Sequence, residues 1–151
     1  MGEGDTAPDF TLPDQNGTER DLRDLLATGP VALFFFPAAF TGGCTVENRR
    51  FRDLAPDFAA VGAGRVGISP DPVSRLAAFA RAHALGFPVL SDVDGTVARA
   101  FGLVRRFGPL RRQTFVVDTD RRVLAVIRSE FRMEAHADGA LAALRARTDV
   151  G

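Results

Sequence analysis

Cys44 is the only cysteine of the chain, and the segments around it are of a kind that activates a thiol. Residues 31–36, shortly before it, have the length and the β-branched and aromatic content of a buried strand. Residues 47–54, shortly after it, have the pattern of an opening helix. A helix N-terminus presents unpaired N–H groups and a partial positive charge, and both favour a thiolate over a thiol. A lone cysteine is more often an inert core residue, but at a helix start its pKa can be lowered, and its sulfur is then reactive.

Pro37 and Thr41 precede Cys44 with a spacing that resembles the peroxidatic loop of the peroxiredoxins, which are thiol peroxidases that use neither metal nor haem. Other segments resemble elements of the same family and occur in the same order. The resemblance therefore covers nearly the whole chain, from Asp5 to the last predicted helix. The matching segments are APDFTLPDQNG at 7–17, FPVLSD at 87–92 and RQTFVVD at 112–118.

The resemblance and the chemistry of peroxide reduction together imply roles for the residues of this loop. Cys44 would attack one peroxide oxygen and end as a sulfenic acid. In the family, a threonine at the position of Thr41 turns its hydroxyl toward the sulfur and the peroxide. The backbone N–H groups of Gly43 and Cys44 would stabilise the developing oxyanion. Pro37, which has no N–H, would form a wall of the pocket without competing for the peroxide.

Two charged residues complete the predicted site. The family places an arginine three positions before the strand phenylalanine, and here that residue is Arg112 and not Arg111. Its guanidinium would contact both thiolate and peroxide, and an acid at the position of Glu47 pairs with this arginine in the family. From residue types alone, other interpretations stay open. Thr41 could be only a helix N-cap, Arg112 an ordinary surface arginine, and Glu47 an acid favoured by the helix dipole.

The order of strand and helix patterns predicts an α/β fold with a mixed sheet, as a single domain over residues 1–151. The family resemblance identifies this layout as the thioredoxin fold, with helices flanking the central sheet and an N-terminal hairpin extension. Pro56 predicts that the helix after Cys44 kinks or ends there. We expect strands at 31–36, 65–69, 114–117 and 123–128, the last two as an antiparallel hairpin, and helices at 21–26, 73–83, 96–101 and 135–145.

The composition of the chain limits which binding partners and which cellular compartment we expect. Nineteen acidic residues balance nineteen basic ones, which argues against nucleic-acid binding. The sequence has no apolar run near the length that spans a bilayer, and its first residues lack the pattern of a secretory signal. A lone cysteine suits a reducing cytosol, so we expect a cytoplasmic protein. His83 and His136 have no metal-ligand spacing. We expect both at the surface or at helix ends, and no metal or cofactor.

The reductant is the point on which the family's subgroups divide. Many relatives of the Q-type, or bacterioferritin-comigratory, group carry a resolving cysteine where this chain has Arg49. We therefore expect a one-cysteine enzyme whose sulfenic acid is reduced by an external thiol. Residues 40–44 resemble the alkyl hydroperoxide reductase E group, which uses a mycoredoxin or low-molecular-weight thiols. Residues 45–47 resemble the Q type, which uses thioredoxin. Gly42 and Gly43 predict a flexible loop that unwinds easily around the thiol.

The expected function is thus a thiol-dependent peroxidase that reduces hydrogen peroxide and organic hydroperoxides. A peroxide sensor that passes its oxidation to a partner protein through a mixed disulfide is the alternative, and a domain with an inert buried thiol is a third reading. Phe107, Pro109 and Leu110 form an arginine-flanked segment that favours an edge contact in a homodimer.

Overall fold

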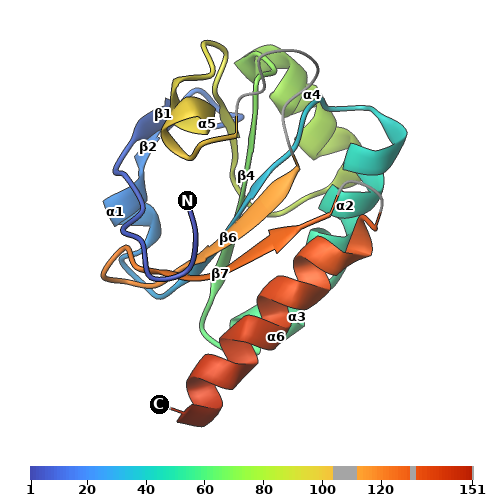
Figure 1. Ribbon diagram of the computed structural model, residues 1–151. Coiled ribbons are helices and arrows are strands. Elements are labelled where there is room, and N and C mark those ends of the chain that lie inside the picture. The colour runs from blue at the N-terminus through green and yellow to red at the C-terminus, as the bar shows by residue number, and fades with distance from the viewer. Residues whose placement is uncertain (104–111, 130–131, 151) are drawn as a thin grey trace.

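The computed structural model describes residues 1–103, 112–129 and 132–150. Within these ranges, a five-stranded mixed sheet has helices on both faces, and a separate antiparallel hairpin lies near the N-terminus (Figure 1). The thioredoxin fold with an N-terminal hairpin extension is therefore confirmed. The strands are β1 (Thr11–Pro13), β2 (Glu19–Asp21), β3 (Val31–Phe35), β4 (Gly64–Ser69), β5 (Val89–Ser91), β6 (Gln113–Val117) and β7 (Val123–Arg128). The helices are α1 (Leu22–Leu25), α2 (Gly42–Asp53), α3 (Ala55–Ala60), α4 (Val73–His83), α5 (Thr96–Ala100) and α6 (Glu134–Val150).

The order of the central sheet is β5-β4-β3-β6-β7. Strands β3, β4 and β5 are parallel, whereas β6 is antiparallel to both β3 and β7. In the ladder, Phe35 at the end of β3 lies opposite Gln113, the first residue of β6. Because β6 runs against β3, its start lies at the edge where the three parallel strands finish. Arg112, directly before β6, is thereby brought to the segment that follows β3.

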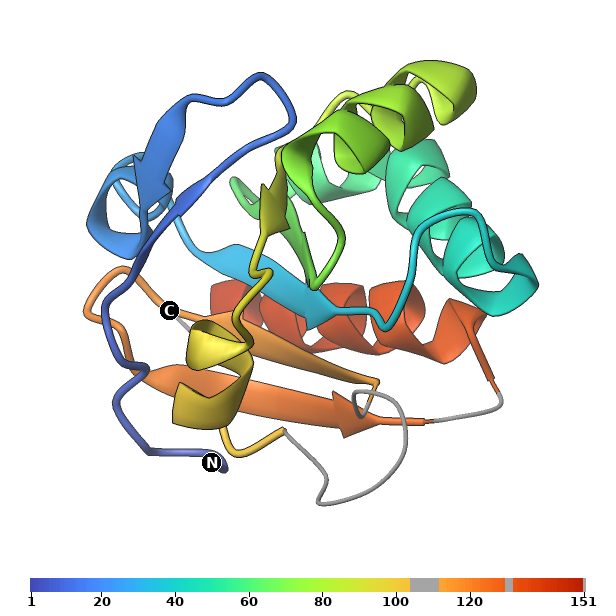
Figure 2. The same ribbon diagram turned by 90° about the horizontal axis from the view of Figure 1, so that it is seen from above.

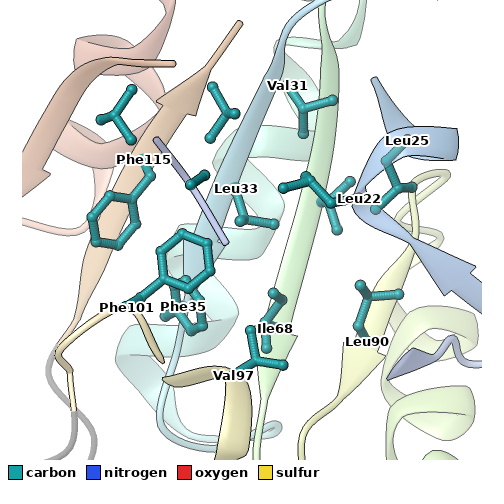
Figure 3. Packing of buried hydrophobic residues seen from close by; sticks show 14 of the residues in the cluster. Leu22, Leu25, Val31, Leu33, Phe35, Ile68, Leu90, Val97, Phe101 and Phe115 are labelled. Carbon is teal, nitrogen blue, oxygen red and sulfur yellow. The ribbon is translucent and has the colours of Figure 1, made fainter. Parts of the chain in front are cut away.

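Strand β3 is buried on both of its faces, which explains its uninterrupted apolar sequence. Side chains alternate along a strand, so Leu33 and Phe35 pack against Leu22 of α1 and Phe101 after α5 (Figure 3). Phe34 packs on the opposite face with apolar residues of α2, α3, α4 and α6. Helices α1 and α5 thus cover one face of the sheet, and α2, α3, α4 and α6 cover the other (Figure 2).

Most predicted elements agree with the structure within a few residues. Helix α2 stops at Asp53, and α3 begins at Ala55 with Pro56 in its first turn, where a missing N–H costs no helical hydrogen bond. The predicted helix at 135–145 is longer at both ends, and the sequence pattern does not predict β5, which has only three residues. The predicted dimer contact at 107–110 falls outside the described residues. Among the described residues, no helix has the length and apolar character needed to cross a membrane.

Candidate active site

Cys44 is the third residue of α2, and its side chain is fully buried. Thr41 is the N-cap residue, with an extended backbone. The N–H of Thr45 donates to the carbonyl oxygen of Thr41 at 2.9 Å, which begins the helical hydrogen bonding. The backbone N–H groups of Gly43 and Cys44 come before this bond, in the turn whose amides have no acceptor within a helix. The thiol therefore lies in the positive first turn of a helix, as predicted.

Arg112 joins this thiol to a buried acid. One terminal guanidinium nitrogen, Nη2, donates to Sγ of Cys44 at 3.3 Å, and the other, Nη1, donates to Oε1 of Glu47 at 2.6 Å. Arg112 is 7% exposed and Glu47 is fully buried. Burial alone would lower the pKa of Arg112, but its attraction to Glu47 and Cys44 and its hydrogen bonds to both raise that pKa above its ordinary value. The guanidinium therefore places a positive charge beside the sulfur.

These contacts decide two of the open interpretations. The predicted pairing of Glu47 with Arg112 is confirmed, and Arg112 is a buried partner of the thiol rather than an ordinary surface arginine. Glu47 is the sixth residue of α2, outside the first turn in which the helix dipole would explain it. Arg111, the neighbour that the family pattern passed over, lies outside the described residues.

For His136 the helix-end prediction is confirmed, and the surface alternative is wrong. It lies near the start of α6, but it is fully buried rather than at the surface. Its Nε2 lies 2.7 Å from the carbonyl oxygen of Ser129, its Nδ1 lies 2.8 Å from Oγ1 of Thr114, and the same Nδ1 lies 3.6 Å from Oε2 of Glu47. Because a carbonyl oxygen only accepts, we assign a proton to Nε2. The imidazole ring of His136 thus lies next to Glu47, the acid that pairs with Arg112.

The sequence carried little signal for this histidine. A single histidine without a second ligand-type residue at a regular spacing forms no motif. The partners of His136 come from α2, from β6 and from Ser129 directly after β7. His83 is the last residue of α4, which confirms its placement at a helix end. Among the described residues, no group of three or more His, Cys, Asp or Glu side chains is arranged to hold a metal ion.

Thr41 is exposed, and its hydroxyl donates to the carbonyl oxygen of Ala38 at 2.8 Å. Thr41 thus occupies the N-cap position, but its hydroxyl makes no cap bond to the helix. The role of Thr41 toward sulfur and peroxide stays a prediction. Pro37 is partly buried at the start of the same segment, which leads from β3 into α2.

The two glycines before the thiol are placed differently from the prediction. Gly42 and Gly43 form the first turn of α2 rather than a flexible loop. A Cβ on Gly43 would lie 3.3 Å from Sδ of Met133 and 3.4 Å from Nη2 of Arg112. Glycine at position 43 permits the close approach of these two side chains, and the predicted ease of unwinding around the thiol stays a prediction.

A mixed sheet with helices on both faces and a buried thiol in the first turn of α2 defines a thioredoxin-fold protein with a thiol centre. The profile of the AhpC/TSA family matches residues 3–126, and the chain belongs to this family. Its relatives are named peroxiredoxins, which are thiol-dependent peroxidases, so the family resemblance drawn from the sequence is confirmed.

Several relatives match over nearly their full length. Peroxidoxin BcpB from Mycobacterium tuberculosis has a crystal structure that is 59% identical in sequence, with a TM-score of 0.94 and 97% of each chain covered. The bacterioferritin comigratory protein of Xanthomonas campestris, whose alkyl peroxide reduction activity has been studied structurally, is 30% identical, with a TM-score of 0.84 and 91% of each chain covered. Peroxiredoxin Bcp of Escherichia coli K12 is 34% identical over 142 residues, which cover 89% of this chain and 90% of that protein.

Proposed function

We propose that Cys44 is the peroxidatic residue of a one-cysteine peroxiredoxin that reduces hydrogen peroxide and small organic hydroperoxides. The contact of 3.3 Å between Arg112 Nη2 and the sulfur carries this proposal. The thiolate attacks one oxygen of the O–O bond, so that an S–O bond forms as the O–O bond breaks. The sulfur loses two electrons and becomes a sulfenic acid, while the other oxygen leaves as hydroxide or alkoxide and takes up a proton.

The groups around Cys44 would stabilise the negative charge of the thiolate and of the leaving oxygen. The guanidinium of Arg112 stabilises the attacking thiolate and the negative charge that gathers on the leaving oxygen. Glu47 acts through Arg112 by fixing the direction of its fork of donors. The backbone N–H groups of Gly43 and Cys44 add donors from the helix start, and Thr41 would position the bound peroxide.

An external thiol must reset the enzyme, because a chain with one cysteine forms no internal disulfide. The first thiol attacks the sulfenic sulfur, water leaves, and a mixed disulfide forms. A second thiol then releases Cys44 and leaves with the first as a disulfide. We propose thioredoxin, or a mycoredoxin with a low-molecular-weight thiol, as the donor. We also propose a cytoplasmic location, which suits a lone thiol.

Steady-state turnover tests this proposal. Peroxide consumption is followed with dithiothreitol, and then with thioredoxin or a mycoredoxin, for the wild type and for Cys44→Ser, with hydrogen peroxide and with cumene hydroperoxide. The proposal predicts many turnovers for the wild type and none for Cys44→Ser. Retained turnover in Cys44→Ser would overturn it. A wild type that oxidises once and then persists as a mixed disulfide with a partner would instead support the sensor function.

A further inference from the structure

The segment 37–41 that leads into α2 is held by the chain between β4 and α4. Oδ2 of Asp71 accepts a hydrogen bond from the N–H of Ala39 at 2.7 Å, and Nη2 of Arg75 donates to the carbonyl oxygen of Ala39 at 3.1 Å. Nε of Arg75 lies 3.1 Å from Oδ1 of Asp71. One ion pair therefore binds both polar backbone groups of the residue at the centre of the segment. We call this pair the Ala39 clamp.

The acid of the Ala39 clamp is anchored in the sheet. The hydroxyl of Ser69, the last residue of β4, donates to Oδ2 of Asp71 at 2.8 Å. The hydroxyl of Ser91, the last residue of β5, donates to the carbonyl oxygen of Asp71 at 2.6 Å. All three residues are buried, and hydrogen bonds to a buried carboxylate are strong. The segment before the thiol is thus held in register with the ends of two parallel strands.

The arginine of the clamp also holds a strained residue. Phe40 has a φ of +64°, in the left-handed region that side chains other than glycine rarely adopt. Its ring lies 5.2 Å from the guanidinium carbon of Arg75 and contacts Phe79 edge-on. Phe40 is nevertheless 45% exposed, so few other contacts oppose its release. Loss of the Arg75 guanidinium therefore removes two contacts at once, the stacking on the ring of Phe40 and the hydrogen bond to the carbonyl oxygen of Ala39. Both lie at or next to the strained backbone of Phe40.

Access to the sulfur makes this arrangement relevant to the reaction. Cys44 is fully buried, so a thiol reductant, and above all a protein, reaches its sulfenic acid only after the segment before it opens. Oxidation instead needs the closed arrangement, in which Arg112 contacts the sulfur. The two half-reactions therefore use different conformations of segment 37–41.

We propose that Asp71 and Arg75 are positioning residues that set the balance between a closed segment 37–41, in which Cys44 is oxidised, and an open one, in which the sulfenic acid is reduced. This inference rests on the peroxidase function proposed above. When the closed form dominates, weakening the clamp enlarges the small open population and leaves the closed population almost unchanged. Reduction should therefore become faster while oxidation changes little, which is a pattern that general damage to the fold does not produce.

The test compares Arg75→Gln with the wild type and with Arg81→Gln, a control that removes an exposed arginine from the same helix. Oxidation is measured with one equivalent of hydrogen peroxide, and reduction is measured with the coloured thiol thionitrobenzoate. We expect Arg75→Gln to accelerate reduction about fivefold and to change oxidation less than twofold, since an ion pair with a half-exposed arginine and a stacking contact has an effect of this order. Arg75→Lys should be intermediate, and Arg81→Gln should match the wild type.

Amide hydrogen exchange at Ala39 provides a readout that needs no peroxide. The N–H of Ala39 is bound to Asp71, so its exchange in the reduced protein should accelerate about fivefold in Arg75→Gln and remain unchanged in Arg81→Gln. Equal reduction rates and equal exchange in Arg75→Gln and the wild type would overturn the clamp but leave the proposed function standing. A wild type that forms no sulfenic acid would overturn the proposed function, although the exchange of Ala39 could still be compared.

Discussion

Oε1 of Glu47 lies 2.6 Å from Nη1 of Arg112 in the interior, although 65 residues separate the two along the chain. The antiparallel ladder between β3 and β6 produces this meeting, because it brings the start of β6 to the end of β3. The other terminal nitrogen of the same guanidinium then reaches the sulfur of Cys44. Glu47, Arg112 and Cys44 thus form one buried chain of contacts.

Replacing Arg112 should impair oxidation more than any other change at the site, apart from loss of the thiol. Arg112→Lys keeps a positive charge but cannot contact both Glu47 and the sulfur with a planar fork. We expect the rate constant for oxidation of Cys44 by hydrogen peroxide to fall about 100-fold, as for the loss of one preorganised donor. Single-turnover oxidation followed by thiol alkylation measures it. Arg99→Lys, a change on the exposed side of α5, is the control, and an unchanged rate in Arg112→Lys would contradict the assigned role.

Arg112→Gln should in addition destabilise the fold. Glu47 is fully buried, and removing the charge of its partner leaves its carboxylate poorly compensated. Breaking a buried ion pair from one side costs about 3 kcal/mol or more. Urea unfolding at neutral pH, followed by far-UV circular dichroism, checks this value against the wild type. A loss below about 1 kcal/mol would mean that other groups compensate Glu47.

His136 should contribute to stability through its two ring nitrogens rather than through its ring volume. His136→Phe keeps a ring but leaves the hydroxyl of Thr114 and the carbonyl oxygen of Ser129 without these contacts. We expect a loss of about 2 kcal/mol in the free energy of unfolding. The matched control is His83→Phe at the partly exposed end of α4, which should change stability by less than about 0.5 kcal/mol. Equal losses in both variants would contradict the buried network.

Local patterns in the sequence predict the α/β layout, and the resemblance to the family supplies the thioredoxin fold and the candidate residues of the thiol site. Apolar runs, turn residues and Pro56 locate the elements, and the spacing of Pro37, Thr41 and Cys44 locates the loop. The positions of His136 and Asp71 were not predicted. The surroundings of both residues depend on the order and register of the strands in the sheet. That order is encoded by the whole chain and not by any short segment. The helical turn at Gly42 and Gly43 is not predicted by the sequence, because glycine disfavours helices, and the close neighbours of Gly43 come from distant parts of the chain.

Asp118 should make part of the stability depend on acidic pH. It receives two hydrogen bonds from Arg147 of α6, at 3.0 and 3.2 Å. Burial alone would raise the pKa of Asp118, but the hydrogen bonds from Arg147 and from the N–H of Thr119 lower it below its ordinary value of 3.8. Because the folded-state pKa is the lower one, the contribution is complete above about pH 4 and is lost as the pH falls through the folded-state value.

Asp118→Asn measures this contribution. Because Arg147 is partly exposed, we expect the variant to be less stable by only about 0.5–1 kcal/mol at pH 7. The difference in Tm between the variant and the wild type should be the same at pH 7 and pH 5, and it should shrink below about pH 4. A difference that grows toward acid would have the wrong sign and would exclude the pair as its cause.

Direct trapping of the sulfenic acid tests whether Cys44 is a peroxidatic thiolate. With neither tryptophan nor tyrosine, the chain offers no strong intrinsic fluorescence, so intact-protein mass spectrometry is the suitable method. The reduced protein receives one equivalent of hydrogen peroxide, with and without dimedone, beside Cys44→Ser. We predict one stoichiometric adduct on Cys44, formed at least about 100-fold faster than on free cysteine at the same pH. Oxidation no faster than that of free cysteine would contradict the claim and leave only a shared fold.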